Sequence, residues 1–473
     1  MSKIVKLGKT VGRAIASYCV IDPVFQFGCG RQAALWLEAS VFRMGCDARH
    51  YAFRQFLSPL SSHCLEMRVV YLNPVGEVGG AELSLLDVMA SVAEAIPGVE
   101  RHLIVAGDGP LIAKAEALGV TVHVLPLPET LAALGDSGLR DRGRLGKIGG
   151  LLIQAVPVGL AVRGYTERLR ALLRELDPTI VHSNGIKTHI LLKLSGFNEA
   201  PVIWHVRDFY GPRPLMARAL RWACGGVSRA IAISGAVGRD AEAILKGVPV
   251  TVVYNAIDTV RFAPGVGDGA RLDGLASLPA ALEGTVRVGL VATYARWKGQ
   301  DLFMIAIGRV QSVRPARFYI VGGPIYKTKG SQFSEQELRK LAGELGVADR
   351  LAFVPFQAET VDAFRALDVV IHASTHPEPF GRTIVEAMAC SRPVVVANAG
   401  GASELFTEGK DALGVTPGDP DALAQAMDRL IDNDTERHAI GERARATALT
   451  RYARERLGRD IANVYAQLKA PTV

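Results

Sequence analysis

Apolar runs of four to seven residues alternate with longer mixed stretches along the chain from Met67 onward. The first run, Arg68 to Asn73, has the sequence RVVYLN. Short apolar runs that alternate with helical patterns are typical of parallel strands joined by helices, so we expect an α/β fold. The predicted strands are 68–73, 102–106, 121–125, 179–183, 201–206, 229–233 and 250–254, followed by 286–292, 317–321, 351–354, 368–373, 393–397 and 412–415.

A turn-rich stretch, 266–284, separates these two series of strands. Several Gly and Pro residues between 263 and 284 predict a linker between two βα domains. The first domain is predicted at 67–265 and the second at 285–450. A final helix, 451–473, follows the second domain.

Residues 1–66 lack this periodicity and hold four of the six Cys residues. Met67 stands directly before the first predicted strand. We therefore expect residues 1–66 to be a disordered leader or the product of a misassigned start, with Met67 as the biological start. The alternative is a basic arm that contacts a membrane.

Composition narrows the class of protein. The chain is 49% hydrophobic and 21% charged, which is typical of a globular protein with a large core. Its net charge of +7 comes without a nucleic-acid-binding motif, so an anionic substrate or membrane surface is expected rather than a nucleic acid. Because no CxxC pair and no apolar signal segment is evident, we expect a cytoplasmic protein without zinc or disulfides.

A basic segment lies between Ser137 and Arg170. Seven Lys and Arg residues and two acidic ones flank an uncharged run of 15 residues, 148–162. The run is too short to cross a bilayer. It is either a core helix beside a solvated basic loop or a segment that lies on the inner membrane surface as a peripheral contact.

The stretch 374–404 has the densest candidate chemistry. It follows the predicted strand 368–373, and a loop broken by prolines holds Glu378. Gly381 then opens a helical segment that contains Glu386. A helix N-terminus attracts phosphate, and a carboxylate can accept hydrogen bonds from two hydroxyls. The stretch therefore predicts a sugar nucleotide at the carboxyl end of a parallel sheet, whereas the alternative is two solvated surface charges.

Three further places carry candidate residues. Gly79 and Gly80 follow the first strand and either let a ligand approach closely or form an ordinary turn; they do not complete the dinucleotide pattern GxGxxG. Arg296 and Lys298 follow the strand that opens the second domain, where cations could neutralise a diphosphate. His205 ends a strand and is either a structural hydrogen-bonding residue or part of the site.

The segment PEPFGRTIVEAMACSRPVV around Glu378 and Glu386 resembles the signature of glycosyltransferase family 4. Gly-Gly-Ala-Glu at 79–82 and Lys298-Gly299 are also similar to that family. The resemblance implies the GT-B fold, in which two Rossmann-like domains face each other across a cleft and the final helix, 451–473, crosses back to the first domain. It further implies a retaining, hexosyltransferase-like enzyme that takes a nucleotide sugar as donor and needs no metal or other cofactor. The donor base, the sugar and the acceptor stay open, and polysaccharide biosynthesis is the expected setting.

The resemblance also implies roles for individual residues. Glu378 would hold hydroxyls of the donor sugar, Glu386 the ribose, and His205 would orient the sugar. Since Ala292-Thr293 replaces the Gly-Arg pair common in the family, Arg296 is expected to supply the second cation beside Lys298. The catalytic candidates are Glu378, His205, Arg296 and Lys298, and the donor-binding candidates are Gly79, Gly80, Arg296, Lys298, Phe380, Gly381 and Glu386.

Two other classes of function remain as alternatives. One is a GT-B epimerase or phosphorylase, and the other is a nucleotide-sugar-binding protein without catalysis. Asp432-Asn433-Asp434 has the spacing of a metal-binding DxD motif, but it interrupts a helical region, so we predict a turn there and no metal site.

Overall fold

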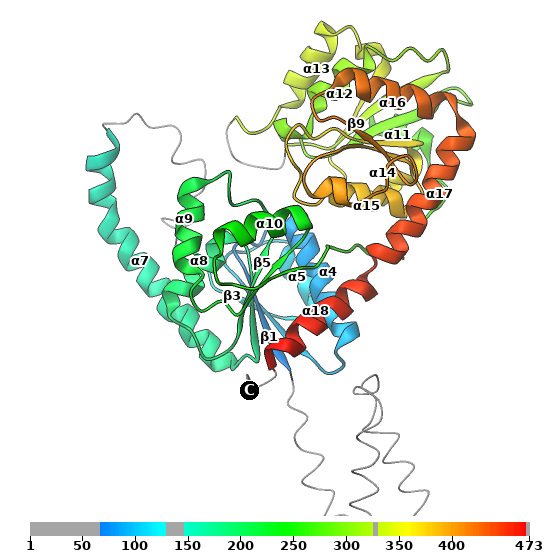
Figure 1. The fold of residues 1–473 in the computed structure, drawn as a ribbon. Helices are drawn as coiled ribbons and strands as arrows, with labels where there is room; N and C mark the ends of the chain where they lie inside the picture. Colours follow the sequence, from blue (N-terminus) through cyan, green and yellow to red (C-terminus); the bar gives the residue numbers. More distant parts are fainter. Residues whose placement is uncertain (1–66, 129–145, 325–329, 470–473) are drawn as a thin grey trace, which may run out of the picture. The chain divides into compact units, whose positions relative to one another are not determined.

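The computed structural model describes residues 67–128, 146–324 and 330–469, and for 146–157 it describes only the helical backbone. All described residues belong to one compact unit, 66–473. The expectations for residues 1–66 therefore concern a part of the chain outside the described residues. Two parallel sheets flanked by helices make up the described part (Figure 1).

The first sheet has the strand order β3-β2-β1-β4-β5-β6-β7. Every neighbouring pair is parallel. The order reverses between β1 and β4, and ligands bind at such a point in open α/β sheets. The strands are β1 (Arg68–Asn73), β2 (Glu100–Val105), β3 (Thr121–Val124), β4 (Ile180–Asn184), β5 (Val202–Val206), β6 (Arg229–Ala232) and β7 (Val250–Val252).

Helices cover both faces of this sheet. They are α4 (Gly80–Ala95), α5 (Leu111–Glu116), α7 (Gly146–Leu176), α8 (Ile186–Ser195), α9 (Pro214–Ala223), α10 (Gly235–Ile244) and the last helix, α18 (Arg454–Lys469). Leu457, Ile461 and Val464 recur at helical spacing on α18 and are buried in the same core cluster as Val69 of β1. The end of the chain thus completes the core of the first domain, beside α4 (Figure 1).

The uncharged run 148–162 lies within α7. From Val158 on, where side chains are described, Val158 and Val162 pack against the core while Leu160 is exposed. No helix in the described part of the chain is long and apolar enough to cross a membrane.

The second sheet repeats the order of the first, β10-β9-β8-β11-β12-β13. Its strands are β8 (Val286–Val291), β9 (Ala316–Val321), β10 (Leu351–Val354), β11 (Val369–His372), β12 (Val394–Ala397) and β13 (Leu413–Val415). Its helices are α12 (Gln300–Ile307), α13 (Glu335–Glu344), α14 (Val361–Ala366), α15 (Arg382–Ala389), α16 (Pro420–Asp432) and α17 (Asp434–Arg451), with short 3-10 helices η2 (Arg296–Lys298), η3 (Ala348–Arg350) and η4 (Gly401–Glu404). The predicted α/β fold with two parallel sheets is confirmed.

The stretch 266–284, predicted as a linker, contains a helix, α11 (Gly269–Leu275). Asp268 caps it by accepting a hydrogen bond from the Arg271 amide at 2.8 Å. Asp273 is fully buried and accepts a hydrogen bond from the Tyr319 hydroxyl of β9 at 2.5 Å. The glycines of this stretch suggested a loop, but a buried carboxylate fastens it to the second sheet.

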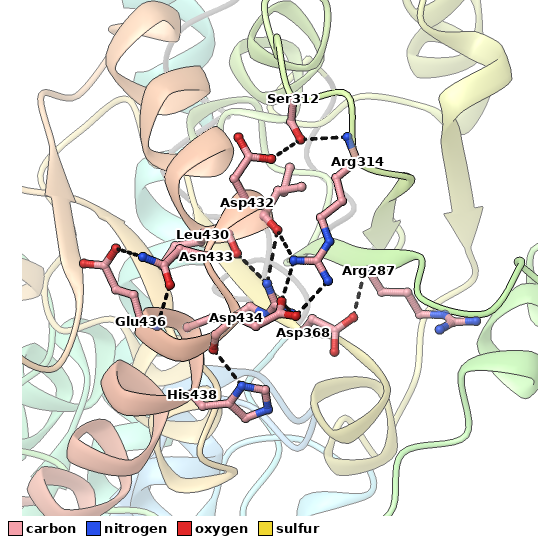
Figure 2. A network of polar contacts seen from close by, with 12 residues as sticks. Arg287, Ser312, Arg314, Asp368, Leu430, Asp432, Asn433, Asp434, Glu436 and His438 are labelled. Atoms are coloured by element: carbon pink, nitrogen blue, oxygen red, sulfur yellow. Dashed lines mark hydrogen bonds and ion pairs between the residues drawn. The ribbon is translucent and has the colours of Figure 1, made fainter.

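The Asp432-Asn433-Asp434 segment forms the turn between α16 and α17, as predicted (Figure 2). Asn433 caps α17 by accepting from the Glu436 amide at 3.0 Å. Asp434 receives two hydrogen bonds from Arg314, at 2.6 and 2.8 Å. The two carboxylates of the motif thus serve as protein contacts, since Asp432 accepts from the Ser312 hydroxyl.

Candidate functional site

Two loops of the second domain meet because β8 and β11, which precede them, are neighbours in the sheet. The Thr375 amide donates to the Trp297 carbonyl at 2.8 Å. Gly299 adopts a φ of 76°, and a Cβ there would lie 2.0 Å from the Ala373 carbonyl oxygen. Only glycine permits this approach, and it places Lys298 beside Glu378.

Glu378 is held by one of its two carboxylate oxygens. Its Oε2 accepts from Lys298 Nζ at 2.7 Å, Ser374 Oγ at 3.0 Å and His372 Nε2 at 3.3 Å. No described residue is hydrogen-bonded to Oε1. Although burial alone raises the pKa of Glu378, the Lys298 ammonium and the His372 hydrogen bond hold it well below its ordinary value. Glu378 is therefore an ionised, oriented carboxylate with one oxygen left for a ligand.

The turn after Glu378 leads into α15. Gly381 precedes the helix with a φ of 101°, a conformation that favours glycine. The Phe380 ring is buried and lies edge-on to Tyr452, with ring centroids 6.0 Å apart. Phe380 can therefore contribute to a ligand site only through its backbone, and its part in donor binding stays a prediction. Ser234 of the first domain donates to the Pro379 carbonyl at 2.7 Å and holds the same turn.

Glu386 lies inside α15 and is also held by one oxygen. Its Oε1 accepts from Arg382 Nε at 2.7 Å, and within the described ranges Oε2 has no hydrogen-bond partner. Arg382 also donates to Asp87 of α4 at 2.5 Å, so the pair reaches the first domain. Burial, with a contribution from Asp87, raises the pKa of Glu386 above its ordinary value, while Arg382 opposes the rise.

This contact between domains continues beyond Arg382. Asp87 accepts from Arg454 of α18 at 2.8 Å, and Arg454 donates to Asp258 at 2.8 Å. Sequence reasoning missed Arg382, Asp87 and Arg454. The available signal was the i,i+4 spacing of Arg382 and Glu386 on a predicted helix.

Gly79 and Gly80 open α4 at the end of β1. The Gly79 amide donates to the Glu82 carboxylate at 3.1 Å, which closes the first turn. A Cβ on Gly80 would meet nothing within 4 Å, so packing does not require glycine there. The predicted use of these glycines by a ligand stays a prediction.

His205 ends β5 and faces His182 of β4. Its Nδ1 lies 3.0 Å from His182 Nε2, and its Nε2 is buried with no hydrogen-bond partner in the described part. Burial and the Arg207 charge lower the pKa of both, to about 3 for His182 and well below its ordinary value for His205. Both imidazoles are therefore neutral near pH 7. Arg207, which sequence reasoning missed, also donates to Asn255 at 3.2 Å.

Arg296 is not brought to the Lys298–Glu378 pair. It donates to Glu337 of α13 at 2.8 Å, and its guanidinium lies 4.2 Å from the centre of the Phe333 ring. Arg296 and Lys298 are two residues apart in a 3-10 helix, which has three residues per turn, so they point to different sides. This position disagrees with the prediction that Arg296 supplies the second cation at a diphosphate.

Family models match most of the described chain. Residues 78–261 match the model described as Glycosyltransferase Family 4, and residues 281–447 match Glycosyl transferases group 1. The chain is 32% identical over 250 residues to the lipopolysaccharide core biosynthesis mannosyltransferase LpsB of Rhizobium meliloti, covering 52% of this chain and 68% of that one. It is 37% identical over 191 residues to the D-inositol 3-phosphate glycosyltransferase of Acidothermus cellulolyticus, covering 39% of this chain but only 40% of that relative.

Solved structures share the fold over 85% of this chain. Anabaena HepE in complex with UDP-glucose has a TM-score of 0.68 and 25% identity, covering 85% of this chain and all of that one (100%). Sucrose-phosphate synthase from Thermosynechococcus elongatus has a TM-score of 0.66 at 16% identity and covers 85% of this chain. These neighbours are GT-B glycosyltransferases, so the predicted fold class is confirmed.

Proposed function

This chain belongs to glycosyltransferase family 4, and from that premise we propose that it moves a sugar from a nucleotide sugar to a hydroxyl-bearing acceptor with retention of configuration. The observation that carries the proposal is the pair Glu378 and Glu386 at α15. Each carboxylate is oriented through one oxygen and has its other oxygen unpaired among the described residues. Free carboxylate oxygens at a helix N-terminus suit a ligand with both hydroxyls and phosphates.

We propose for these residues the roles that the resemblance to the family implies. Glu378 accepts hydrogen bonds from the donor sugar, and Glu386 accepts them from the ribose. Lys298 and the amides at the start of α15 stabilise the diphosphate as charge develops on it. In this proposal these groups offset the negative phosphate charge that a metal ion neutralises in other transferases. We therefore expect an added chelator to leave turnover unchanged.

The transfer breaks the bond between the anomeric carbon and the phosphate oxygen. The acceptor oxygen forms the new bond on the same face of the sugar, and its proton passes to the departing phosphate. Glu378 is not assigned as a nucleophile, because its bound oxygen is occupied by Lys298, Ser374 and His372 and its free oxygen serves the sugar hydroxyls. The acceptor lies on the first domain in this proposal, with the segment 127–165 as the first candidate for acceptor choice; its residues 129–145 are outside the described residues.

The deciding experiment is calorimetric titration of the full chain with UDP, GDP and ADP, without added metal. HepE was solved with UDP-glucose, so we expect UDP to bind most tightly. Turnover of the matching sugar nucleotide, followed by NMR of the product's anomeric proton, tests retention. Folded protein that binds none of the three nucleotides would refute the proposal.

The alternative of an epimerase, phosphorylase or non-catalytic binding protein is not favoured, since the relatives reported above are named as transferases. An epimerase would convert the sugar nucleotide without an acceptor. Incubation of the donor with enzyme alone, followed by chromatography of the nucleotides, separates the two functions.

We also propose that α9 contacts an anionic membrane surface. Leu215 and Trp222 of α9 have exposed fractions of 77% and 59%, and the exposed Arg218 and Arg221 lie on the same helix. An exposed helix with both cationic and large apolar side chains is suited to anionic headgroups.

Flotation with vesicles tests this contact. We expect the full chain to bind vesicles that contain phosphatidylglycerol and not vesicles of phosphatidylcholine alone. Leu215→Ser with Trp222→Ser should abolish flotation, while Leu282→Ser, at a residue with an exposed fraction of 80%, should not. Equal binding by all variants would refute the assignment.

A further inference from the structure

Four buried polar side chains form a row of neighbouring polar groups, here called the file, that leads through the first domain to His205. The Tyr71 and Tyr465 hydroxyls are 3.4 Å apart, Tyr465 Oη lies 2.7 Å from His182 Nδ1, and His182 Nε2 lies 3.0 Å from His205 Nδ1. The four residues come from β1, α18, β4 and β5, and none has an exposed fraction above 1%. Apolar side chains would fill this part of the core without needing partners, whereas each buried polar group must find a hydrogen-bond partner. A continuous file of polar groups is therefore more than core packing requires.

We propose that Arg207, His182 and Tyr465 are positioning residues that together fix the tautomer of His205, so that its Nε2–H is presented as a hydrogen-bond donor to the sugar of the nucleotide donor. The inference rests on the proposed function for the identity of the ligand. It adds the residues that set the proton of His205 and the atom that carries it.

Arg207 favours one direction of the hydrogen bonds along the file. Its Nη2 lies 3.4 Å from His205 Nδ1, and a guanidinium can only donate. Arg207 therefore favours an acceptor at His205 Nδ1, which places the proton of the neutral ring on Nε2. His182 then donates from Nε2 to His205, and its Nδ1 accepts from the Tyr465 hydroxyl. Tyr71 lies at the far end of the file, with its hydroxyl 3.4 Å from that of Tyr465.

The opposite direction of the hydrogen bonds is disfavoured at the contact between Arg207 and His205. If His205 carried its proton on Nδ1, that N–H would face the Arg207 donor. A doubly protonated His182 ring does not make the opposite order possible, because burial lowers the pKa of His182 to about 3. Burial also raises the pKa of Tyr465 well above its ordinary value, so the phenol keeps its proton.

The end of the file indicates a ligand. His205 Nε2 is buried and has no hydrogen-bond partner in the described part of the chain. His205 pairs in register with Asn184, at the carboxyl ends of β4 and β5, where open α/β sheets bind ligands. A neutral N–H donor suits a sugar hydroxyl, which can accept a hydrogen bond without bearing a charge.

The test is NMR of the full chain labelled with ¹⁵N-histidine. Long-range ¹H–¹⁵N correlations identify which ring nitrogen carries the proton, and His205→Gln identifies the signals of His205. We expect a proton on Nε2 of His205 and on Nε2 of His182 without any ligand. A His205 ring protonated at Nδ1 would overturn the inference whether or not the chain is a transferase.

Variants of the file provide the second readout. Tyr465→Phe removes the donor to His182, so we expect mixed tautomers of both rings and a loss of about threefold to tenfold in kcat, the range of one hydrogen bond, with nucleotide Kd unchanged. His182→Gln should preserve the His205 tautomer, because an amide N–H can replace Nε2–H, while His182→Leu should not. Tyr319→Phe removes a buried hydroxyl of the second domain and is the control.

Ligand titration separates this inference from the proposed function. UDP-glucose should shift the His205 Nε2–H signal and UDP alone should not, since the nucleotide lacks the sugar. Nucleotide binding with no shift from the sugar would overturn the inference and leave the proposed function standing. Absence of all nucleotide binding would refute both.

Discussion

Glu378 and Glu386 are eight residues apart on either side of the start of α15, yet their surroundings differ. The partners of Glu378, which are Lys298, Ser374 and His372, all belong to the second domain. Glu386 is bonded to Arg382, which also contacts Asp87 of the first domain. One carboxylate is oriented by its own domain, and the other by a bridge between domains.

The pKa shifts of the two carboxylates have opposite directions. Burial raises the pKa of each, but Lys298 and His372 outweigh it at Glu378, while Arg382 does not at Glu386, where Asp87 adds to the rise. Burial alone thus does not determine the charge of a site; the number and charge of its partners do. We infer that Glu378 provides a fixed negative charge and that the protonation state of Glu386 depends on the position of the first domain, which supplies Asp87.

The largest expected effect is from Lys298→Met, which leaves Glu378 buried without its ammonium partner. Removing one member of a buried ion pair costs about 3–5 kcal/mol of unfolding free energy. Urea denaturation of the variant measures the loss. Lys340→Met removes a largely exposed partner of Glu344 and should leave stability unchanged. Equal stability of the two variants would show that the Glu378 pair is not a buried ion pair.

Glu378→Gln should lower kcat by about 10²–10³-fold, the range for loss of one preorganised electrostatic contact. Nucleotide affinity should change little, because Glu378 is assigned to the sugar. Steady-state kinetics and calorimetry together give both values. If Glu378→Gln and Glu386→Gln weaken nucleotide binding equally, the distinction between the two carboxylates is wrong.

Arg382→Gln should weaken nucleotide binding by about tenfold, the effect of losing a charge-assisted hydrogen bond that orients Glu386. Arg339→Gln breaks an exposed i,i+4 pair with Glu335 on α13 and is the matched control. Asp87→Asn, at the far end of the bridge, should weaken binding in the same direction. Unchanged nucleotide affinity in Asp87→Asn would show that the proposed link between domains is wrong.

The smallest expected effect is in the pH dependence of nucleotide affinity. Because the pKa of Glu386 is raised by burial, its ionised form is lost as the pH falls through that raised value, and affinity should fall with it. Glu378 stays ionised over the same range, because its pKa is lowered. Calorimetry between about pH 4 and 8 should show an acid limb in the wild type that disappears in Glu386→Gln. A limb that persists there would assign the titration to another group.

Sequence patterns were sufficient for the strands and for the two carboxylates. Buried parallel strands are continuous apolar runs, so 368–373 and 393–397 are visible without a structure. Glu378, Gly381 and Glu386 are close in sequence, so one loop and one helix place them together.

The parts that sequence reasoning missed depend on distant partners or on side-chain direction. Arg382 and Asp87 are separated by 295 positions, and nothing local indicates their contact. Arg296 was expected beside Lys298, but the turn of η2 directs it to Glu337. The glycines of 266–284 predicted a loop and gave no sign of helix α11. The stretch is held by the buried Asp273 carboxylate, whose partners are distant in sequence.

The position of α18 has a consequence for the synthesis of the protein. Leu457, Ile461 and Tyr465 complete a core whose first strand begins at Arg68. A ribosome must therefore make the whole second domain before the first domain can close its core. Until then the apolar surface beside α4 stays uncovered, which exposes the nascent chain to chaperones and proteases. Chains that stop before α18 should be degraded even though both sheets are fully encoded.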